Sequence, residues 1–296
     1  MRILLAGASG LIGTAVARHA DAHEVRRLVR RTPGADEYAW DPASGALPSE
    51  AVAWADAIIS LSGASLSRLP WTKKYRKQIL RSRVDATTTI ARAIAASDAP
   101  PKAWVSGSAV GFYGDRPGEP LTEESPRGAG YLADVVGAWE EATEPAERTT
   151  RVVHARTGLV LAADGALKPL MLTTRFGLGA TVGTGTQHWP WIALADEARA
   201  LLHLAAESSL SGAVNLVAPA SATSRQVTTG LARALSRPYR LRLPAFALRA
   251  GMGLAAEELL LADQQVLPSR LNDDGFRFEH PALDEAIAAA VAPTRA

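Results

Sequence analysis

An apolar run at the start of the chain passes directly into three glycines spaced three residues apart, in the stretch MRILLAGASGLIG. Residues 3–6 are continuously apolar, which is typical of a strand buried on both faces of a parallel sheet. From Leu11 the apolar positions recur at helical spacing, through Ile12, Ala15 and Val16. The pattern therefore predicts a strand, a glycine-rich turn and a helix at the amino end of the chain.

Similar apolar runs recur along the chain and alternate with stretches of helical spacing. The further predicted strands are 24–29, 57–60, 102–108 and 213–217, and the helical stretches are 68–83, 87–96, 131–142 and 224–235. This alternation indicates an α/β protein with a Rossmann-type doubly wound parallel sheet. We expect residues 1–164, completed by about 196–236, to form the sheet domain. Residues 165–195 and 237–296 are expected to form a smaller α/β domain on the substrate side.

The glycine turn has the chemistry of an anion-binding site. Gly7 permits a tight turn, Gly10 lets the backbone approach a pyrophosphate, and Gly13 lets the helix pack against the strand. The N–H groups at the start of the helix then face the anion. A glycine triplet alone also occurs in ordinary turns, but its place between a strand and a helix favours nucleotide binding. The expected cofactor contacts here are Gly7, Ser9, Gly10, Leu11, Ile12 and Gly13.

Composition narrows the class of protein. The chain has 296 residues with 47% hydrophobic content, which is enough for one large domain or two closely joined ones. Its net charge of +2 gives little support to nucleic-acid binding. The absence of cysteine removes disulfides and thiolate metal sites, and the scattered histidines predict no metal centre. No run approaches about 18 apolar residues, so we expect a cytoplasmic protein with no membrane contact.

The end of the second predicted strand indicates which cofactor is bound. In a NAD-binding unit an acidic residue at this position would hold the ribose hydroxyls, whereas arginine accepts the 2′-phosphate of NADP. Here the strand is followed by Arg30 and Arg31. The alternative is ordinary surface charge, but the pattern favours NADP.

Small residues and hydroxyls follow two later strands. The strand 57–60 runs into Leu61, Ser62 and Gly63, which would let the chain pass close beneath a ligand. Most charges of the basic helix 68–83 belong to a solvated face, but Arg83 could reach a phosphate from its place after this loop. The strand 102–108 carries Ser106 and Ser108 at the sheet edge where ligands bind, as candidates to hydrogen-bond a substrate oxygen or to cap their own turn.

Together these stretches resemble the extended short-chain dehydrogenase/reductase family. The matching stretches are GASGLIG, SLSG, WTKKYRKQILRSR, SGSAVGFYG, RTGLVL, FGLGATVGTG and VLPSRLNDDGFRF. Within that family the chain looks like an atypical sugar-nucleotide epimerase-like branch, often labelled SulA-like cell-division inhibitor, with a small C-terminal domain of unknown function. The resemblance implies an NADP-dependent epimerase, dehydratase or oxidoreductase acting on a carbonyl or carbinol carbon of a small molecule, with nucleotide sugars as the implied class. It adds Gln78, Arg83, Ser106 and Val160 to the expected cofactor contacts.

The family's catalytic set is a serine or threonine, a tyrosine, and a lysine four residues after the tyrosine. Ser108 and Tyr131 match the first two members, but position 135 is Val135. The family's lysine lowers the pKa of the tyrosine and holds the nicotinamide ribose. Without it, Tyr131 should be a poor base at neutral pH, although it could still donate a proton. Tyr113 is a second candidate phenol, more consistent with a structural role.

The missing lysine leaves a second hypothesis from another class. The chain could be a catalytically weakened NADP(H)-binding regulatory or scaffold protein. Both hypotheses predict cofactor binding, and only the enzyme consumes NADPH with a metabolite.

Overall fold

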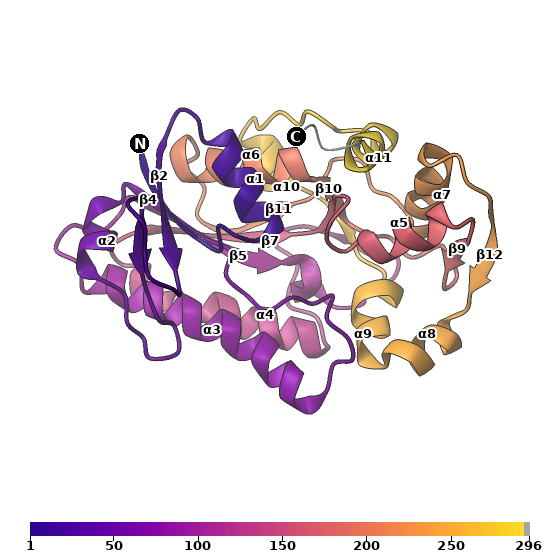
Figure 1. Cartoon of the computed structure of the whole chain (residues 1–296), viewed down its shortest axis with the longest axis horizontal. Coiled ribbons are helices and arrows are strands. Elements are labelled where there is room, and N and C mark those ends of the chain that lie inside the picture. The colour runs from indigo at the N-terminus through magenta and orange to yellow at the C-terminus, as the bar shows by residue number, and fades with distance from the viewer. Residues whose placement is uncertain (293–296) are drawn as a thin grey trace.

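The computed structural model describes residues 1–292 and contains one large parallel sheet (Figure 1). Every strand pair in this sheet is parallel. In spatial order the strands are β11 (Gly212–Leu216), β7 (Arg151–Thr157), β5 (Ala103–Ala109), β4 (Ala57–Ser60), β1 (Arg2–Ala6), β2 (Glu24–Val29) and β3 (Glu37–Ala39). The order reverses between β1 and β4, the position at which doubly wound sheets bind ligands. The predicted Rossmann-type fold is therefore confirmed.

Strand alternation divides the buried residues between the two faces of the sheet. In β1, Ile3 and Leu5 join the core under α1 and α6, while Leu4 and Ala6 join the core under α2 and α3. All four side chains are completely buried. This is why the strand has no polar position, as expected for a sheet covered on both faces.

Helices cover the sheet in two layers, with α1, α6 and α10 on one face and α3 and α4 on the other (Figure 1). The helices are α1 (Leu11–His19), α2 (Ser49–Trp54), α3 (Lys73–Ala95), α4 (Tyr131–Glu141), α5 (Lys168–Arg175), α6 (Leu194–Ala206), α7 (Ser224–Ala234), α8 (Ala245–Met252), α9 (Leu254–Ala256), α10 (Ser269–Asp273) and α11 (Leu283–Val291). Short 3₁₀ turns are η1 (Val110–Tyr113) and η2 (Glu144–Ala146), and η3 (Glu257–Leu261) is a π-helix. The two helical stretches expected at 68–83 and 87–96 form the single helix α3.

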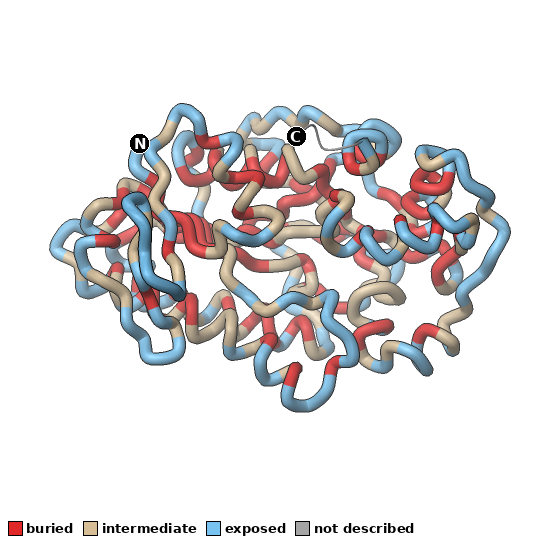
Figure 2. The backbone as a smooth tube through the Cα atoms, in the orientation of Figure 1, coloured by how far each residue is buried: buried red, intermediate tan, exposed pale blue. Residues whose placement is uncertain are grey.

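A smaller region lies at the right of Figure 1, around α5, α7, α8 and α9. It contains parallel strand pairs formed by β8 (Leu159–Leu161) with β10 (Trp191–Ala193) and by β9 (Gly179–Val182) with β12 (Tyr239–Leu243). A third pair joins β6 (Pro120–Leu121) to β13 (Gln265–Val266). Figure 2 shows buried residues continuing from the large sheet into this region.

The packing differs from the expected domain division at two helices. α7, expected to complete the sheet domain, instead packs its buried Val227 and Leu231 into the core of the smaller region. α10, expected in the smaller domain, places Leu271 in the core beneath α1 and α6. The reason is that each buried stripe packs against the nearest uncovered apolar surface, whatever its place in the chain.

Among residues 1–292, no helix is both long enough and apolar enough to cross a membrane.

Candidate functional site

The glycine turn joins the carboxyl end of β1 to α1. Gly7 has φ of +84°, and a Cβ added there would lie 2.8 Å from the carbonyl carbon of Leu61. A Cβ at Gly13 would lie 2.2 Å from the Gly7 oxygen, so any side chain would separate helix from strand. The turn is closed by a hydrogen bond from Gly10 N to Gly7 O of 3.0 Å. The packing of the protein itself therefore requires glycine at positions 7 and 13.

Gly10 differs from the other two glycines of the turn. It is exposed and has φ of −79°, and its only nearby atom for an added Cβ is the Gly7 oxygen at 3.3 Å. This contact is tight but much less severe than those at Gly7 and Gly13, and a shift of a few tenths of an ångström would relieve it. Gly10 is also the N-cap of α1 without any side-chain cap, which leaves N–H groups of the first turn available to an anion. This combination fits a pyrophosphate lying against residue 10.

The arginines after β2 have different surroundings. Arg31 donates from Nη1 and Nη2 to the two carboxylate oxygens of Glu37, at 2.8 and 2.7 Å. Glu37 also accepts from Gly34 N, and hydrogen bonding from Arg31 lowers the pKa of its carboxyl. Arg30 is exposed and has no ion pair within residues 1–292. Of the two arginines, Arg30 is the one with its full guanidinium available to a phosphate.

Arg83 lies against the loop that follows β4. A Cβ on Gly63 would lie 3.1 Å from the Cζ atom of Arg83. Its Nη1 donates to the carbonyl oxygens of Ala64 and Ile79, at 3.2 and 3.1 Å. The guanidinium also lies 5.1 Å from the ring centroid of Trp139. Burial lowers its pKa to about 10, so it remains charged at neutral pH.

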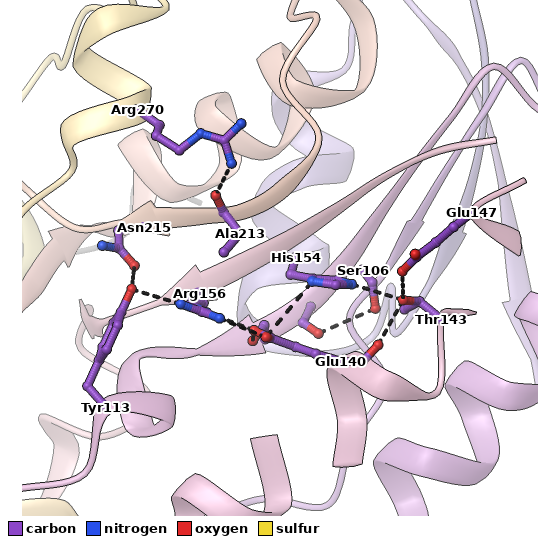
Figure 3. Close-up of polar contacts among 12 residues, drawn as sticks. Ser106, Tyr113, Glu140, Thr143, Glu147, His154, Arg156, Ala213, Asn215 and Arg270 are labelled. Carbon is purple, nitrogen blue, oxygen red and sulfur yellow. Dashed lines mark hydrogen bonds and ion pairs between the residues drawn. The ribbon is translucent and has the colours of Figure 1, made fainter. Parts of the chain in front are cut away.

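Ser108 lies inside a buried polar network between β5, β7 and α4. Its hydroxyl donates to Oε1 of Glu140 over 2.6 Å. Arg156 makes a bidentate contact with the same carboxylate, in which Nε donates to Oε1 and Nη2 to Oε2, both at 2.8 Å (Figure 3). Ser108 and Arg156 are partners in the β5–β7 register, which is why both reach Glu140.

The network continues toward β11 and the carboxyl-terminal region. Arg156 Nη1 donates to the hydroxyl of Tyr113, and that hydroxyl donates to Asn215 Oδ1 over 2.7 Å (Figure 3). Tyr113 is completely buried, and burial raises the pKa of its phenol. Its contacts give Tyr113 a structural role. On the other side, His154 contacts Thr143 at 2.9 Å, and burial lowers the pKa of its imidazole.

Tyr131 begins α4 at the opposite end from Glu140. Its hydroxyl donates to the carbonyl oxygen of Arg76 in α3, at 2.7 Å. Tyr131 and Glu140 are nine positions apart, which corresponds to about 13 Å along the helix axis. The hydroxyls of Tyr131 and Ser108 therefore have different hydrogen-bond partners, and no hydrogen bond joins them within residues 1–292. Desolvation is the main cause that raises the pKa of the Tyr131 phenol, so it holds its proton at neutral pH.

Glu258 of η3 anchors the start of α4. Its two carboxylate oxygens accept from Tyr131 N at 2.7 Å and from Leu132 N at 3.1 Å. Four residues into the helix, Val135 is buried in an apolar cluster with Trp71, Tyr75 and Ile79 in place of the family's lysine. The chain therefore has no ammonium group at this position.

The remaining predicted contacts lie on several different elements. Ser106 is buried on β5, and its hydroxyl lies 3.4 Å from the Gly107 oxygen. Gln78 is exposed on α3, and Val160 lies on β8, opposite Ile192 of β10. Leu61 continues from β4 and hydrogen-bonds to β1, through its N–H and the Ala6 oxygen at 2.9 Å.

Sequence reasoning assigned no role to Glu140, Arg156, Glu197 or Glu258. Arg156 carried a usable signal, because a charged residue three positions after the apolar pair Val152 and Val153 needs a partner if that strand is buried. Glu197 of α6 is completely buried and accepts a hydrogen bond from Thr157 over 2.7 Å, while its Oε2 has no partner among residues 1–292. Burial raises the pKa of its carboxyl to about 8. Neither Glu197 nor Glu258 shows a sequence signal, since their contacts come from distant elements.

The doubly wound parallel sheet with a glycine turn at its switch point places the protein in the Rossmann-type α/β class. A model of the NAD dependent epimerase/dehydratase family matches residues 3–216, and a model of a domain of unknown function (DUF1731) matches residues 243–290. The chain belongs to the NAD dependent epimerase/dehydratase family. An epimerase family protein of Mycobacterium leprae is 41% identical over 290 residues, which cover 96% of this chain and 94% of that protein. These findings confirm the family resemblance noted in the sequence.

Two solved structures extend the comparison. The human epimerase family protein SDR39U1, crystallised with NADPH, superposes with a TM-score of 0.90 at 34% identity, covering 98% of this chain and 99% of that one. A nucleoside-diphosphate sugar epimerase from Corynebacterium glutamicum has a TM-score of 0.80 at 32% identity, covering 98% of this chain and 58% of that one. Both similarities extend across the sheet and the smaller region.

Proposed function

We propose that this protein binds NADP(H) across the carboxyl ends of β2, β1, β4 and β5 and transfers a hydride between nicotinamide and a carbonyl or carbinol carbon. The observation that carries the proposal is the start of α1 at the switch point of the sheet, where Gly10 is exposed and no side chain caps the N–H groups of the first helical turn. The NADPH in the human relative supports the same cofactor. Under this proposal the turn holds the pyrophosphate, and Arg30, assisted by Arg31, holds the 2′-phosphate.

The bound cofactor supplies the hydride chemistry, and the protein supplies binding, orientation and proton transfer. We expect the cofactor to pass beside the loop after β4, which contains Leu61, Ser62 and Gly63. Its further expected contacts are Gln78 of α3, Ser106 of β5 and Val160 of β8. Tyr131 is the candidate proton donor because its phenol stays protonated at neutral pH. To reach a substrate oxygen its hydroxyl must leave the Arg76 carbonyl. Ser108, whose proton points to Glu140, has only acceptor capacity left for a substrate hydroxyl.

For the substrate we propose a small polyol-like metabolite, with nucleotide sugars as the first class to test. The support is the name of the similar Corynebacterium protein, a nucleoside-diphosphate sugar epimerase. The smaller region, with its DUF1731 match, would then bind the part of the substrate remote from nicotinamide.

Substitution of Gly10 by Val tests cofactor binding directly. The branched side chain fills the space proposed for the pyrophosphate, so NADPH binding should fall below detection while the protein remains folded. Gly251→Val is the control, because it introduces the same side chain in α8, where an added Cβ meets open space. Fluorescence titration of NADPH measures affinity, and circular dichroism measures folding. Unchanged NADPH affinity in a folded Gly10→Val protein would refute the proposed site.

A second candidate function is NADP(H) binding without turnover, in a regulatory or scaffold role. Two contacts favour it: Val135 is sealed in an apolar cluster, and the hydroxyls of Ser108 and Tyr131 are bonded to different partners. The Tyr131→Phe variant separates the two candidates once a substrate has been found with a panel of carbonyl compounds and nucleotide sugars. If Tyr131 is the donor, reduction slows about 10²- to 10⁴-fold while NADPH affinity is kept. Firm NADPH binding with no turnover across the panel favours the regulatory role.

A further inference from the structure

The outer part of the smaller region carries positive charge only. Residues 165–195 and 208–256 contain eight lysines and arginines but no aspartate or glutamate, although the whole chain has a net charge of +2. Some of these cations pair with acids from neighbouring segments, as Arg233 does with Asp284. Four exposed arginines have no ion pair within residues 1–292, and they are Arg175, Arg237, Arg240 and Arg242. This surface therefore favours an anionic partner.

Exposed apolar side chains occur in the same region. Within residues 1–292, six of the eight exposed large hydrophobic side chains lie there, and they are Leu172, Phe176, Leu178, Leu241, Leu243 and Phe246. The two phenylalanines are 76% and 73% exposed. Single exposed apolar residues are ordinary, but a group of them beside unpaired cations is typical of an interaction surface. We call these six residues and the four arginines the β12 surface.

β12 is the centre of this surface and lies at the right-hand edge of the molecule in Figure 1. Phe176 and Leu178 precede β9, whose first residue, Gly179, pairs with Tyr239 at the start of β12. Phe246 lies in the first turn of α8, shortly after the last residue of β12. Exposed apolar side chains therefore flank both ends of the strand.

One edge of β12 is free. The strand pairs only with β9, so its other edge has no strand partner within residues 1–292. Its last four residues are all exposed, and successive side chains of a strand point to opposite faces. Leu241 and Leu243 thus lie on one face and Arg242 on the other, while Arg240 lies at an irregularity of the pairing.

We propose that the β12 surface binds an extended acidic segment of another protein, which adds to the free edge of β12 as a further strand. Residues that lie opposite each other in such a pair share a face of the sheet. An acidic residue then lies opposite Arg242, and apolar residues lie opposite Leu241 and Leu243. The segment that fits is therefore one in which acidic and apolar residues alternate. The inference does not depend on the cofactor and goes beyond the proposed function.

Charge argues against a second copy of this chain as the occupant. Antiparallel pairing of two β12 strands places the arginines of both on one face, where like charges are unfavourable. Arginines on an edge strand therefore discourage pairing between copies. The open main-chain groups of the edge also favour a polypeptide over a lipid surface, which offers no strand to pair with.

The test uses a fluorescent synthetic peptide of about eight residues, a common strand length, in which glutamate alternates with leucine. One comparison peptide carries lysine in place of glutamate, and another carries N-methyl groups on alternate amides, which prevent pairing with a strand edge. We expect the acidic peptide to bind the wild-type protein, and both comparison peptides to bind at least about 10-fold more weakly. Hydrogen exchange of the β12 amides should slow when the acidic peptide is bound.

Charge reversal tests the arginines. Arg240→Glu combined with Arg242→Glu should weaken binding of the acidic peptide at least about 10-fold and strengthen binding of the lysine peptide. Arg92→Glu combined with Arg148→Glu is the matched control, because it makes the same change in net charge at exposed positions outside the β12 surface. If the reversed variant does not fold, Arg240→Gln combined with Arg242→Gln should still weaken binding about threefold.

Three results would overturn the inference. The first is no detectable binding of the acidic peptide, and the second is equal affinity for the glutamate and lysine peptides. The third is unchanged affinity for the acidic peptide in a folded variant of Arg240 and Arg242. Binding of the wild type to vesicles that contain phosphatidylserine, without binding of the acidic peptide, would assign the β12 surface to a lipid surface instead.

Discussion

Two of the bidentate contacts between arginine and glutamate in this protein lie in different environments. In the pair Arg156–Glu140 the side chains are 5% and 11% exposed, and the carboxylate also accepts from Ser108. In the pair Arg31–Glu37 the arginine is 66% exposed, and the pair closes a surface loop beyond β2. The first pair joins strands and a helix, and the second lies where a ligand phosphate is expected. The bidentate contact therefore stabilises the interior in the pair Arg156–Glu140, whereas in the pair Arg31–Glu37 it is accessible from solvent.

The largest expected effect is the loss of the buried arginine. Arg156→Met leaves Glu140 as an uncompensated buried charge and also removes a donor to Tyr113. We expect the free energy of unfolding to fall by about 3–5 kcal/mol, as for other broken buried pairs. Urea unfolding measures it, with Arg31→Met as the matched control, for which only a small change is expected. Equal losses in the two variants would remove the distinction between the pairs.

Glu197 sharpens the comparison because it is a buried glutamate without an arginine. Burial raises the pKa of its carboxyl from 4.5 to about 8, so the folded protein holds a proton that the unfolded chain releases. Stability from this group is present below about pH 4.5 and is lost as pH rises toward 8. Glu197→Gln should therefore be more stable than wild type at pH 9 by about 5 kcal/mol, and similar at pH 5.

Thermal and urea unfolding of Glu197→Gln across this pH range give the measurement. Glu141→Gln, at an exposed position of α4, is the control and should show no such pH dependence. A constant difference between Glu197→Gln and wild type from pH 5 to pH 9 would show that Glu197 does not titrate in this interval.

We expect Arg30 and Arg31 to contribute unequally to the selection of NADPH over NADH, because only Arg31 is paired with Glu37. Arg30→Ala should weaken NADPH binding about 10-fold, because its full guanidinium is available to the 2′-phosphate. Arg31→Ala should cost about threefold, since Glu37 already occupies Nη1 and Nη2. NADH affinity should be unchanged in both variants. Wild-type protein that binds NADH as tightly as NADPH would contradict the assignment of these arginines.

The smallest expected effect comes from the acidic member of the exposed pair. Glu37→Gln removes a carboxylate that competes with the cofactor phosphate for Arg31. NADPH affinity should rise about two- to threefold, within the range of exposed ion pairs, and the cost of a subsequent Arg31→Ala change should increase. Isothermal titration of the single and double variants measures this coupling. Weaker NADPH binding in Glu37→Gln would mean that Glu37 orients Arg31 for the phosphate.

The sequence by itself determined the features that arise from local chemistry. β1, β2 and β11 lie within a residue of the predicted strands, because period and apolar run length are local properties. The glycine turn could also be predicted, because Gly7 and Gly13 are required by contacts within a single strand–turn–helix unit and its neighbouring loop. The family resemblance followed from the same motifs, with Val135 as its visible departure.

Only the tertiary structure decided how the polar side chains are paired. Ser108 and Tyr131 suggested a catalytic pair, but strand register and helix length direct Ser108 to Glu140 and Tyr131 to the Arg76 carbonyl. α7 joined the smaller region because its buried stripe faces β9 and α11 there. The Glu37 carboxylate that binds Arg31 and the Ala64 carbonyl that accepts from Arg83 likewise lie outside the segments that carry these arginines. Secondary structure follows from neighbours in sequence, whereas the partner of a charge depends on which elements the fold brings within hydrogen-bonding distance.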